Sequence, residues 1–263
     1  MFTRVAKIQI GTAELDGLAV RFNVRRVPGK LDGAQLDVWG LSQDAYGQIG
    51  RSGVQTRLIA GYADAGTGVL VEGTTIRDSL RRVVQDGEVV TSWQVQESAS
   101  GLARVRLSAS WPSSVTAEEL IRYVASQLQV AVAPVVLPRS PTYARGYVLS
   151  GSAREALSTL ASDCGCRWSI QAGRLVLTPQ NGQAARVRAV VLGAGSGLIG
   201  YPESSDGGRV KVTSLLQPGI MPGDAIRVEG PTLPGDYVVE QLEHRGDLWG
   251  QDWYTALTLR VRA

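Results

Sequence analysis

Gly-Leu-Ile-Gly-Tyr-Pro at 197–202 opens a segment, ending at Ala263, in which short alternating runs are separated by turn residues. Leu-Leu-Gln-Pro-Gly-Ile-Met-Pro-Gly-Asp follows at 215–224, and His-Arg-Gly-Asp-Leu-Trp-Gly-Gln-Asp-Trp-Tyr-Thr follows at 244–255. Side chains alternate between the two faces of a strand, and Gly, Pro and Asp favour tight turns, so this pattern predicts short strands joined by turns. We expect residues 181–263 to form a linker and a small tube-like β-barrel.

The N-terminal part of the chain follows the same plan. Alternation predicts about six strands there, at 5–10, 18–27, 34–39, 55–62, 69–72 and 89–97. We expect connections where turn-forming or charged residues gather, at 28–30, 77–82 and 86–88. Ser42 is placed to cap a short helix at 43–49. Residues 1–103 are therefore predicted to form a first tube-like β-barrel.

The two barrel segments resemble each other. Three pairs of stretches match in their apolar residues and glycines: 56–61 with 225–230, 66–72 with 235–240, and 87–93 with 246–253. A repeated pattern of this kind predicts an internal duplication. Chance agreement is the alternative, because any two barrels share alternation and turn glycines.

The middle of the chain has a different pattern. Thr116-Ala-Glu-Glu119 and Ser152-Ala-Arg-Glu155 are two capping boxes, so each predicts the start of a helix. We expect their inward faces to hold Leu120, Ile121, Val124 and Leu128 in the first helix, and Ala156, Leu157, Leu160 and Ala161 in the second. The second helix is expected to end at Cys164-Gly165 and to be followed by a hairpin at 168–178. Residues 104–180 thus predict an α+β domain, and the predicted fold is mainly β with an α+β insertion: two similar small β-barrel domains flank a helix-containing middle domain.

Composition limits the classes of function. The chain has 263 residues, 44% of them hydrophobic and 19% charged, which is ordinary for a folded protein with several small cores. The net charge of +3 is too small to indicate a basic surface for nucleic acid. The N-terminus lacks a signal-peptide pattern, and no apolar run approaches the roughly 20 residues that span a bilayer. We expect no membrane anchor.

Candidates for chemistry are few. His244 is the only histidine, so a catalytic triad cannot be argued from the sequence, and we expect a structural role for it. Glu118 and Glu119 are adjacent acids expected to complement a helix dipole. Cys164 and Cys166 are expected to be reduced packing residues, with redox or metal chemistry as the alternative. We predict no catalytic residue, no cofactor and no metal ion, and therefore no enzyme.

Aromatic residues are the candidates for partner contacts. Most of the six tryptophans are expected to pack in domain cores. Trp249 lies in a polar turn, which favours an exposed interface anchor. The residues that we predict at a partner interface are Trp39, Tyr46, Trp249 and Trp253.

Several of these stretches carry a family resemblance. They are Trp39-Gly-Leu-Ser42, Leu58-Ile-Ala-Gly-Tyr62 and Val71-Glu-Gly73; the helix–strand region 153–179; and Gly197–Pro202 with Leu215–Pro218, Pro222-Gly-Asp224 and Gly235–Val239. Together they resemble the central baseplate hub proteins of contractile-tailed phages and related tail-like particles. The Gly-Leu-Ile-Gly-Tyr-Pro and Leu-Gln-Pro…Pro-Gly-Asp pair is the most specific part of this resemblance.

The resemblance implies a structural virion protein. Such a hub is a homotrimer whose two barrels per chain form a pseudo-hexameric ring, joining the hexameric tail tube to the trimeric spike. Its partners are the tail tube protein, the spike protein and other baseplate proteins, with DNA only in transit through the channel. Its place is the tail baseplate of the virion, after assembly in the host cytoplasm. No lysozyme-like segment is recognised, which argues against a cell-wall-cutting role.

Two other functions stay open at this point. A peptidoglycan-degrading tail subunit would need a catalytic acid in a cleft, and an assay on purified cell wall tests that hypothesis. A cell-envelope or carbohydrate-binding module would be a monomer without affinity for tail proteins, which light scattering at several concentrations tests.

Overall fold

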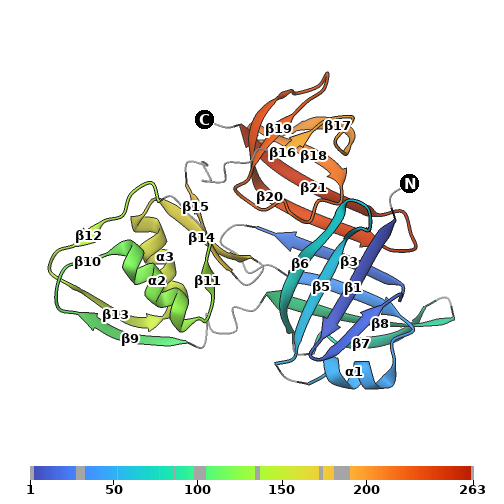
Figure 1. Ribbon diagram of the computed structural model, residues 1–263, viewed down its shortest axis with the longest axis horizontal. Helices are drawn as coiled ribbons and strands as arrows, with labels where there is room; N and C mark the ends of the chain where they lie inside the picture. The colour runs from blue at the N-terminus through green and yellow to red at the C-terminus, as the bar shows by residue number, and fades with distance from the viewer. Residues whose placement is uncertain are drawn as a thin grey trace.

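The computed structural model describes most of the chain, namely residues 3–27, 33–51, 53–76, 78–85, 87–97, 105–133, 137–171, 174–180 and 190–261. The fold is mainly β, with a helix-containing middle domain between two β units, as predicted (Figure 1). The expected turn at 28–30 and most of the linker before residue 190 lie outside the described residues, as do Arg77 and Asp86. No helix in the described ranges is long and apolar enough to cross a bilayer.

The N-terminal unit consists of strands around a short helix. Its elements are β1 (Arg4–Ile10), β2 (Ala13–Asp16), β3 (Val20–Arg26), β4 (Gly33–Trp39), α1 (Gln43–Ile49), β5 (Gln55–Tyr62), β6 (Gly66–Thr75), β7 (Arg81–Gln85) and β8 (Glu88–Glu97). Burial alternates along β3 and β4, which places one face of each strand in the core. As predicted, Ser42 caps α1, because its hydroxyl accepts a hydrogen bond from the Ala45 amide at 3.2 Å.

Three strands of this unit differ from the sequence prediction: β6 (Gly66–Thr75) is longer than the expected 69–72, and β2 and β7 were not predicted as strands. The expected charged connection at 77–82 is wrong at its end, because β7 begins at Arg81. Within the described part of the chain β7 pairs with β8 alone, and most of its side chains are exposed, so charged residues are tolerated there. The short β2 was not predicted; it pairs with β1, and Lys7 of β1 forms ion pairs with Glu14 and Asp16.

The C-terminal unit contains a second set of strands. They are β16 (Val190–Leu192), β17 (Leu198–Ser205), β18 (Arg209–Leu215), β19 (Ala225–Val228), β20 (Gly235–Asp247) and β21 (Trp253–Val261). Buried apolar residues from these strands, including Val212, Leu242 and Leu259, form the core of this unit. Two buried residues of this unit, Leu216 and Trp253, belong instead to the hydrophobic core of the N-terminal unit, and the partly buried Leu215 and Leu248 pack against it. The C-terminal unit is therefore packed directly against the hydrophobic core of the N-terminal unit.

One sheet runs through both units. Within the described residues, fourteen strands are hydrogen-bonded into it, and β20 is antiparallel to β3 where the units meet. Their register runs from Leu242 opposite Arg26 to Asp247 opposite Arg21. In Figure 1 the C-terminal strands accordingly lie against the N-terminal strands, whereas the middle domain stands to one side.

The strand order is the same in the two units. The order β3-β4-β8-β6-β5-β1 in the first corresponds to β17-β18-β21-β20-β19-β16 in the second, and corresponding strands follow the same order along the chain. One pairing differs in direction, because β1 is antiparallel to β5 whereas β16 is parallel to β19. Among the described residues, the helix α1 and the strands β2 and β7 have no counterpart in the second set. This correspondence supports the internal duplication inferred from the sequence.

The sequence overlay agrees with this topology in two of its three parts. It placed β5 over β19 and β6 over β20, as the pairings do. The third part is displaced along the chain. It matched residues 87–93 with 246–253, so the start of β8 was laid over the end of β20 and the turn before β21, whereas the topology matches β8 with β21 itself. No pairing among the described residues joins the first strand of either order to its last, so closed barrels stay a prediction.

The middle domain packs two helices between small sheets (Figure 1). Its elements are β9 (Arg106–Trp111), β10 (Val115–Thr116), α2 (Ala117–Gln127), β11 (Ala131–Val132), β12 (Thr142–Tyr143), β13 (Tyr147–Ser152), α3 (Ala153–Asp163), β14 (Cys166–Gln171) and β15 (Arg174–Pro179). The strands β10 to β13 were not predicted; three of these have only two residues, too few for alternation to be seen. The expected turn between β14 and β15 lies outside the described residues.

Both predicted capping boxes are present. The Glu119 amide donates to the Thr116 hydroxyl at 3.2 Å, and the Glu119 carboxylate accepts from the Thr116 amide at 2.8 Å. Ser152 and Glu155 make the same reciprocal pair at the start of α3. The expected inward faces are buried except for two residues: Leu128 follows the end of α2 as its C-cap, and Ala156 is only partly covered.

Candidate partner-binding surface

Trp249 is the most exposed large hydrophobic side chain that the structure describes, at 78% of its full exposure. It lies in the turn between β20 and β21, here called the Trp249 turn and comprising residues 247–252. An exposed indole in a monomeric surface is a common anchor of protein interfaces. The hydrogen bonds of the turn backbone, described next, determine how firmly the indole is held in position.

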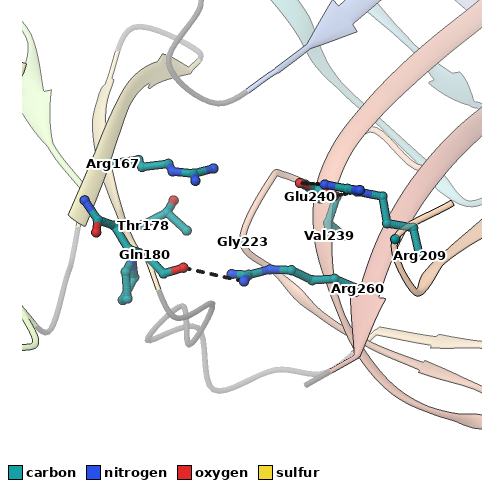
Figure 2. A pocket seen from close by; sticks show the side chains of 10 residues that line it. Arg167, Thr178, Gln180, Arg209, Gly223, Val239, Glu240 and Arg260 are labelled. Atoms are coloured by element: carbon teal, nitrogen blue, oxygen red, sulfur yellow. Dashed lines mark hydrogen bonds and ion pairs between the residues drawn. The ribbon is translucent and has the colours of Figure 1, made fainter. Parts of the chain in front are cut away.

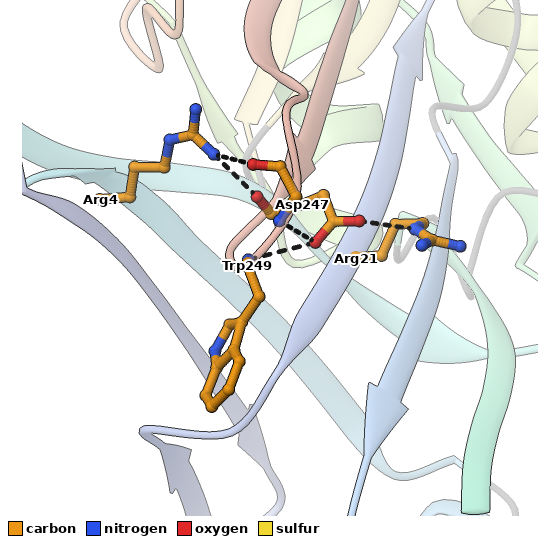
Figure 3. Close-up of polar contacts among 5 residues, drawn as sticks. Arg4, Arg21, Asp247 and Trp249 are labelled. Atoms are coloured by element: carbon orange, nitrogen blue, oxygen red, sulfur yellow. Dashed lines mark hydrogen bonds and ion pairs between the residues drawn. The ribbon is translucent and has the colours of Figure 1, made fainter. Parts of the chain in front are cut away.

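Asp247 organises this turn. Its Oδ1 atom accepts hydrogen bonds from the amides of Trp249 at 3.2 Å and Gly250 at 2.8 Å (Figure 3). Its amide donates to the carbonyl oxygen of Asp252 at 2.6 Å, which closes the turn. The second carboxylate oxygen, Oδ2, receives the Nε–H of Arg21 on β3 at 3.0 Å. An aspartate that accepts from the following amides is a local turn-forming device, so the sequence itself specifies this backbone.

The N-terminal unit holds the same turn from a second direction. The Nη1 atom of Arg4 donates to the carbonyl oxygens of Asp247 at 3.1 Å and Gly250 at 2.7 Å, as Figure 3 shows. Its Nη2 atom donates to the carbonyl oxygen of Gln251 at 3.3 Å. The Leu248 amide donates to the carbonyl oxygen of Val20 at 3.0 Å. A backbone fixed in this way loses little freedom on binding, which favours affinity.

Trp253 has a different role from the one predicted. It is only 3% exposed and belongs to the hydrophobic core of the N-terminal unit. Its ring packs edge-on against Phe22 at a centroid distance of 5.4 Å, and the guanidinium of Arg4 lies 5.6 Å from its centroid. The structure therefore places Trp253 beneath the Trp249 turn as a packing residue, where it supports the turn from inside.

The other two predicted interface residues are partly buried under arginines. The guanidinium of Arg21 lies 5.1 Å from the centroid of Trp39, so Arg21 links Trp39 to Asp247 of the Trp249 turn. Tyr46 on α1 lies under Arg82, at 4.5 Å. Arg82 also donates to the carbonyl oxygen of Leu41 at 2.7 Å and to Gln43. The structure thus brings Trp39 next to the Trp249 turn and places Tyr46 in a separate cluster with Arg82.

The histidine and the two adjacent acids that were considered as candidates for chemistry are held by contacts within the fold. His244 is fully buried on β20, and its Nδ1 atom lies 2.9 Å from the Thr255 hydroxyl. Burial, with a smaller contribution from Arg26, lowers the pKa of His244 to about 3, so the ring is neutral near pH 7. Glu119 completes the capping box of α2 with Thr116, and Glu118 pairs with Arg122 at 2.7 Å.

The two cysteines are free and buried, as predicted. Burial raises the pKa of the Cys164 thiol, and it raises the pKa of Cys166 to about 11. Protonated thiols are poor nucleophiles and poor metal ligands. The described residues contain no group of three or more His, Cys, Asp or Glu side chains that could hold a metal ion.

The glycine-rich stretch at 193–197 forms a turn. The Ser196 hydroxyl accepts a hydrogen bond from the Gly193 amide at 2.7 Å, and the stretch leads directly into β17. A phosphate-binding loop would precede a helix, whose N-terminus contributes to anion binding. This stretch therefore lacks the structural context of a nucleotide site.

Some exposed apolar side chains were not singled out from the sequence. They are Val83, Val84 and Val89 on the β7–β8 hairpin, and Ile199 and Tyr201 on β17. Alternation predicts one buried face for a strand, but it does not reveal whether that face meets a second layer. These residues add apolar surface at two free edges of the sheet.

The fold can be compared with those of known proteins. No family model matches the chain, and no curated protein sequence matches it. A tail protein from Neisseria meningitidis MC58 superimposes with a TM-score of 0.67 at 12% identity, covering 98% of this chain and 96% of its own. The 43 kDa tail protein of prophage MuSo2 from Shewanella oneidensis gives a TM-score of 0.68 at 9% identity, covering 98% and 97%.

A third solved structure comes from a secretion machine. The E. coli c3393 protein is described as a component of the type VI secretion system with structural similarity to the T4 bacteriophage tail proteins gp27 and gp5. It gives a TM-score of 0.61 at 11% identity and covers 97% of this chain and 77% of its own. The chain therefore has the fold of phage tail proteins. The resemblance that its sequence motifs carry is confirmed in the fold.

Proposed function

We propose that this chain is the central hub of a phage-type baseplate and that it joins a hexameric tail tube to a trimeric spike. The observation that carries this proposal is the repeated strand order of the two β units. Three chains around a three-fold axis place six near-equivalent units in one ring. The six β units of such a ring can contact the six subunits of the tail tube on one side. On the other side, its three chains can contact the three subunits of the spike.

The likeness to solved tail proteins supports this role. The two tail proteins are covered over nearly their whole length, so the likeness extends to the middle domain as well as to the β units. The role is structural rather than catalytic. Its partners are the tail tube, spike and other baseplate proteins, with DNA only in transit. Its place is the virion baseplate, after assembly in the host cytoplasm. The working domain limits are 1–103, 104–180 and 181–263.

Within this role, the Trp249 turn is a protein contact of the assembly. The indole is exposed, and its backbone is fixed by Asp247, Arg4 and Arg21. Large aromatic side chains on fixed supports carry much of the binding free energy in interfaces. Trp39 extends this surface through Arg21, and Tyr46 forms a second contact at α1.

Light scattering coupled to gel filtration, at several protein concentrations, tests the oligomeric state. We expect a trimer, and we expect electron-microscope images of the particle to show a ring with six lobes. Where assembly requires a partner, the same measurement is made after mixing with the tail tube protein. A chain that stays monomeric and binds neither tube nor spike protein would contradict the proposal.

An assay on purified peptidoglycan separates this role from the enzymatic alternative. We expect no release of soluble fragments by the purified chain. Release that persists in a second, independent preparation would favour a cell-wall-degrading subunit instead.

A further inference from the structure

A cleft with a volume of about 280 Å³ lies between the middle domain and the C-terminal unit. Arg167 of β14 and Thr178 of β15 line one side, and Arg209 of β18, Glu240 of β20 and Arg260 of β21 line the other. Figure 2 shows the Arg167 side chain extending from its strand into the space that faces Glu240 and Arg260. The cleft thus gathers charged groups from parts of the chain that are distant in sequence.

Both carboxylate oxygens of Glu240 are paired with one of the three arginines, Arg209. Arg209 holds both of its carboxylate oxygens, with Nη2 at 2.9 Å from Oε1 and Nε on Oε2. This bidentate pair lowers the pKa of Glu240, and the charges of Arg260 and Arg167 lower it further. Glu240 is therefore ionised and neutralises one positive charge.

The positive charges of the other two arginines, Arg167 and Arg260, are not paired with an acid among the described residues. Arg260 donates to the carbonyl oxygen of Gln180 at 3.5 Å, and no ion pair joins Arg167 or Arg260 to an acid among the residues that the structure describes. The three arginines and one glutamate leave a net charge of +2 (three minus one). The sequence from 181 to 189, which follows Gln180, contains no Asp or Glu and so supplies no further carboxylate.

We propose that this cleft binds an oxyanion, a carboxylate or a phosphate group, between Arg167 and Arg260. The planar guanidinium group matches both kinds of oxyanion with two parallel hydrogen bonds, as Arg209 and Glu240 already show within the cleft. The bound group offsets the excess positive charge. It also links the middle domain, which carries Arg167, to the C-terminal unit, which carries Arg260. This inference is independent of the proposed hub function.

Calorimetric titration of the full chain tests the site with two probes, inorganic phosphate and glutarate, at constant ionic strength set by sodium chloride. We expect saturable binding with one site per chain. Arg167→Ala and Arg260→Ala each weaken binding about tenfold, because each removes a charge-assisted hydrogen-bond donor. Arg174→Ala is the matched control, since Arg174 is an exposed arginine on the same hairpin that does not line the cleft. Its affinity stays unchanged.

Charge changes at the other cleft positions sharpen the test. Glu240→Gln raises the net charge of the cleft, so both probes bind more tightly. Arg167→Glu places a carboxylate of the chain itself in the cleft, so we expect saturable binding of both probes to be lost. This variant provides the test if Arg167→Ala fails to fold. Hydrogen exchange in β15 and β21 slows when the probe binds, because the anion bridges the two parts of the molecule.

The two probes also identify the source of the oxyanion. Binding of phosphate alone supports a phosphate group, and binding of glutarate supports carboxylates of an acidic protein segment. The proposal is overturned if neither probe binds saturably, or if Arg174→Ala weakens binding as much as Arg167→Ala. The second outcome would show general attraction by a positive surface.

Discussion

The Nη1 atom of Arg4 lies 2.7 Å from the carbonyl oxygen of Gly250, and this hydrogen bond joins residues 246 positions apart in the chain. It fixes the turn after β20 to the first strand of the N-terminal unit. The strand β20 is itself paired with β3, so the C-terminal hairpin is held by the N-terminal unit along its side and at its tip. The Trp249 turn therefore depends on both units for its position.

Replacing Arg4 with alanine should loosen this turn. The variant loses the donors to Asp247, Gly250 and Gln251, and we expect the free energy of unfolding to fall by about 1–2 kcal/mol. Urea denaturation measures the loss, and hydrogen exchange of residues 248–250 should become faster. Arg57→Ala is the control, because its ion pair with Glu72 is exposed and we expect a change of less than about 0.5 kcal/mol. Equal effects of the two variants would argue against a specific role for Arg4.

Replacing Trp249 with alanine should separate binding from stability. The side chain is exposed, so we expect the free energy of unfolding to change by less than about 0.5 kcal/mol. Self-association, or binding to the tail tube protein, should weaken at least about tenfold, as for an interface anchor. Analytical ultracentrifugation and a pull-down measure the two contacts separately. Tyr201→Ala removes another exposed aromatic, at 72% exposure, on β17; a similar loss in that variant would show that the effect is not specific to the Trp249 turn.

Trp253 should behave in the opposite way. Alanine at this position leaves a cavity against Phe22 in the N-terminal core, and we expect a loss of about 3–5 kcal/mol in the free energy of unfolding. Phenylalanine should recover part of the loss. Chemical denaturation of the two variants measures the difference. Wild-type stability in Trp253→Ala would mean that the side chain is not packed as described.

His244 should make stability depend on pH. Its pKa is lowered from 6.5 to about 3 in the folded chain, so the unfolded chain binds a proton more readily. Its contribution is therefore fully present above pH 6.5 and is lost as the pH falls from 6.5 towards 3, by an amount on the order of a few kcal/mol. Denaturation of wild type and His244→Gln across this pH range isolates the contribution. A constant difference between the two proteins over the whole range would contradict it.

The cysteines should be unreactive in the folded chain. Cys164 and Cys166 are buried, and the pKa of each thiol is raised, so few thiolates exist near pH 7. We expect Ellman's reagent to label neither residue until the protein is unfolded, after which both react. Rapid labelling of the native protein would revive the hypothesis of redox or metal chemistry.

Local features were predictable from the sequence. The capping boxes at Thr116 and Ser152 satisfy helix amides with residues three positions away, so the signal lies within one turn of chain. The alternation of β5 likewise marks its bounds, Gln55–Tyr62. The polar turn around Trp249 indicated an exposed indole for a similar reason, since Asp247 forms that turn with its own neighbours.

Long-range features were not predictable in the same way. The burial of Trp253 depends on Phe22, and the pairing of β20 with β3 depends on a register between distant strands. Neither leaves a local signal, because alternation defines the faces of a strand but not its neighbour. The cleft of Arg167, Arg209 and Arg260 was missed for the same reason: each is an ordinary arginine in its own strand.

The shared ladder between β3 and β20 has a mechanical consequence. Its register runs from Leu242 opposite Arg26 to Asp247 opposite Arg21, so a row of backbone hydrogen bonds joins the two antiparallel strands. A force that slides one unit past the other along these strands is borne by all of those bonds together, so none of them fails alone. We therefore expect the two units to move together under such a load, because sliding them apart would require the whole β3–β20 ladder to break at once.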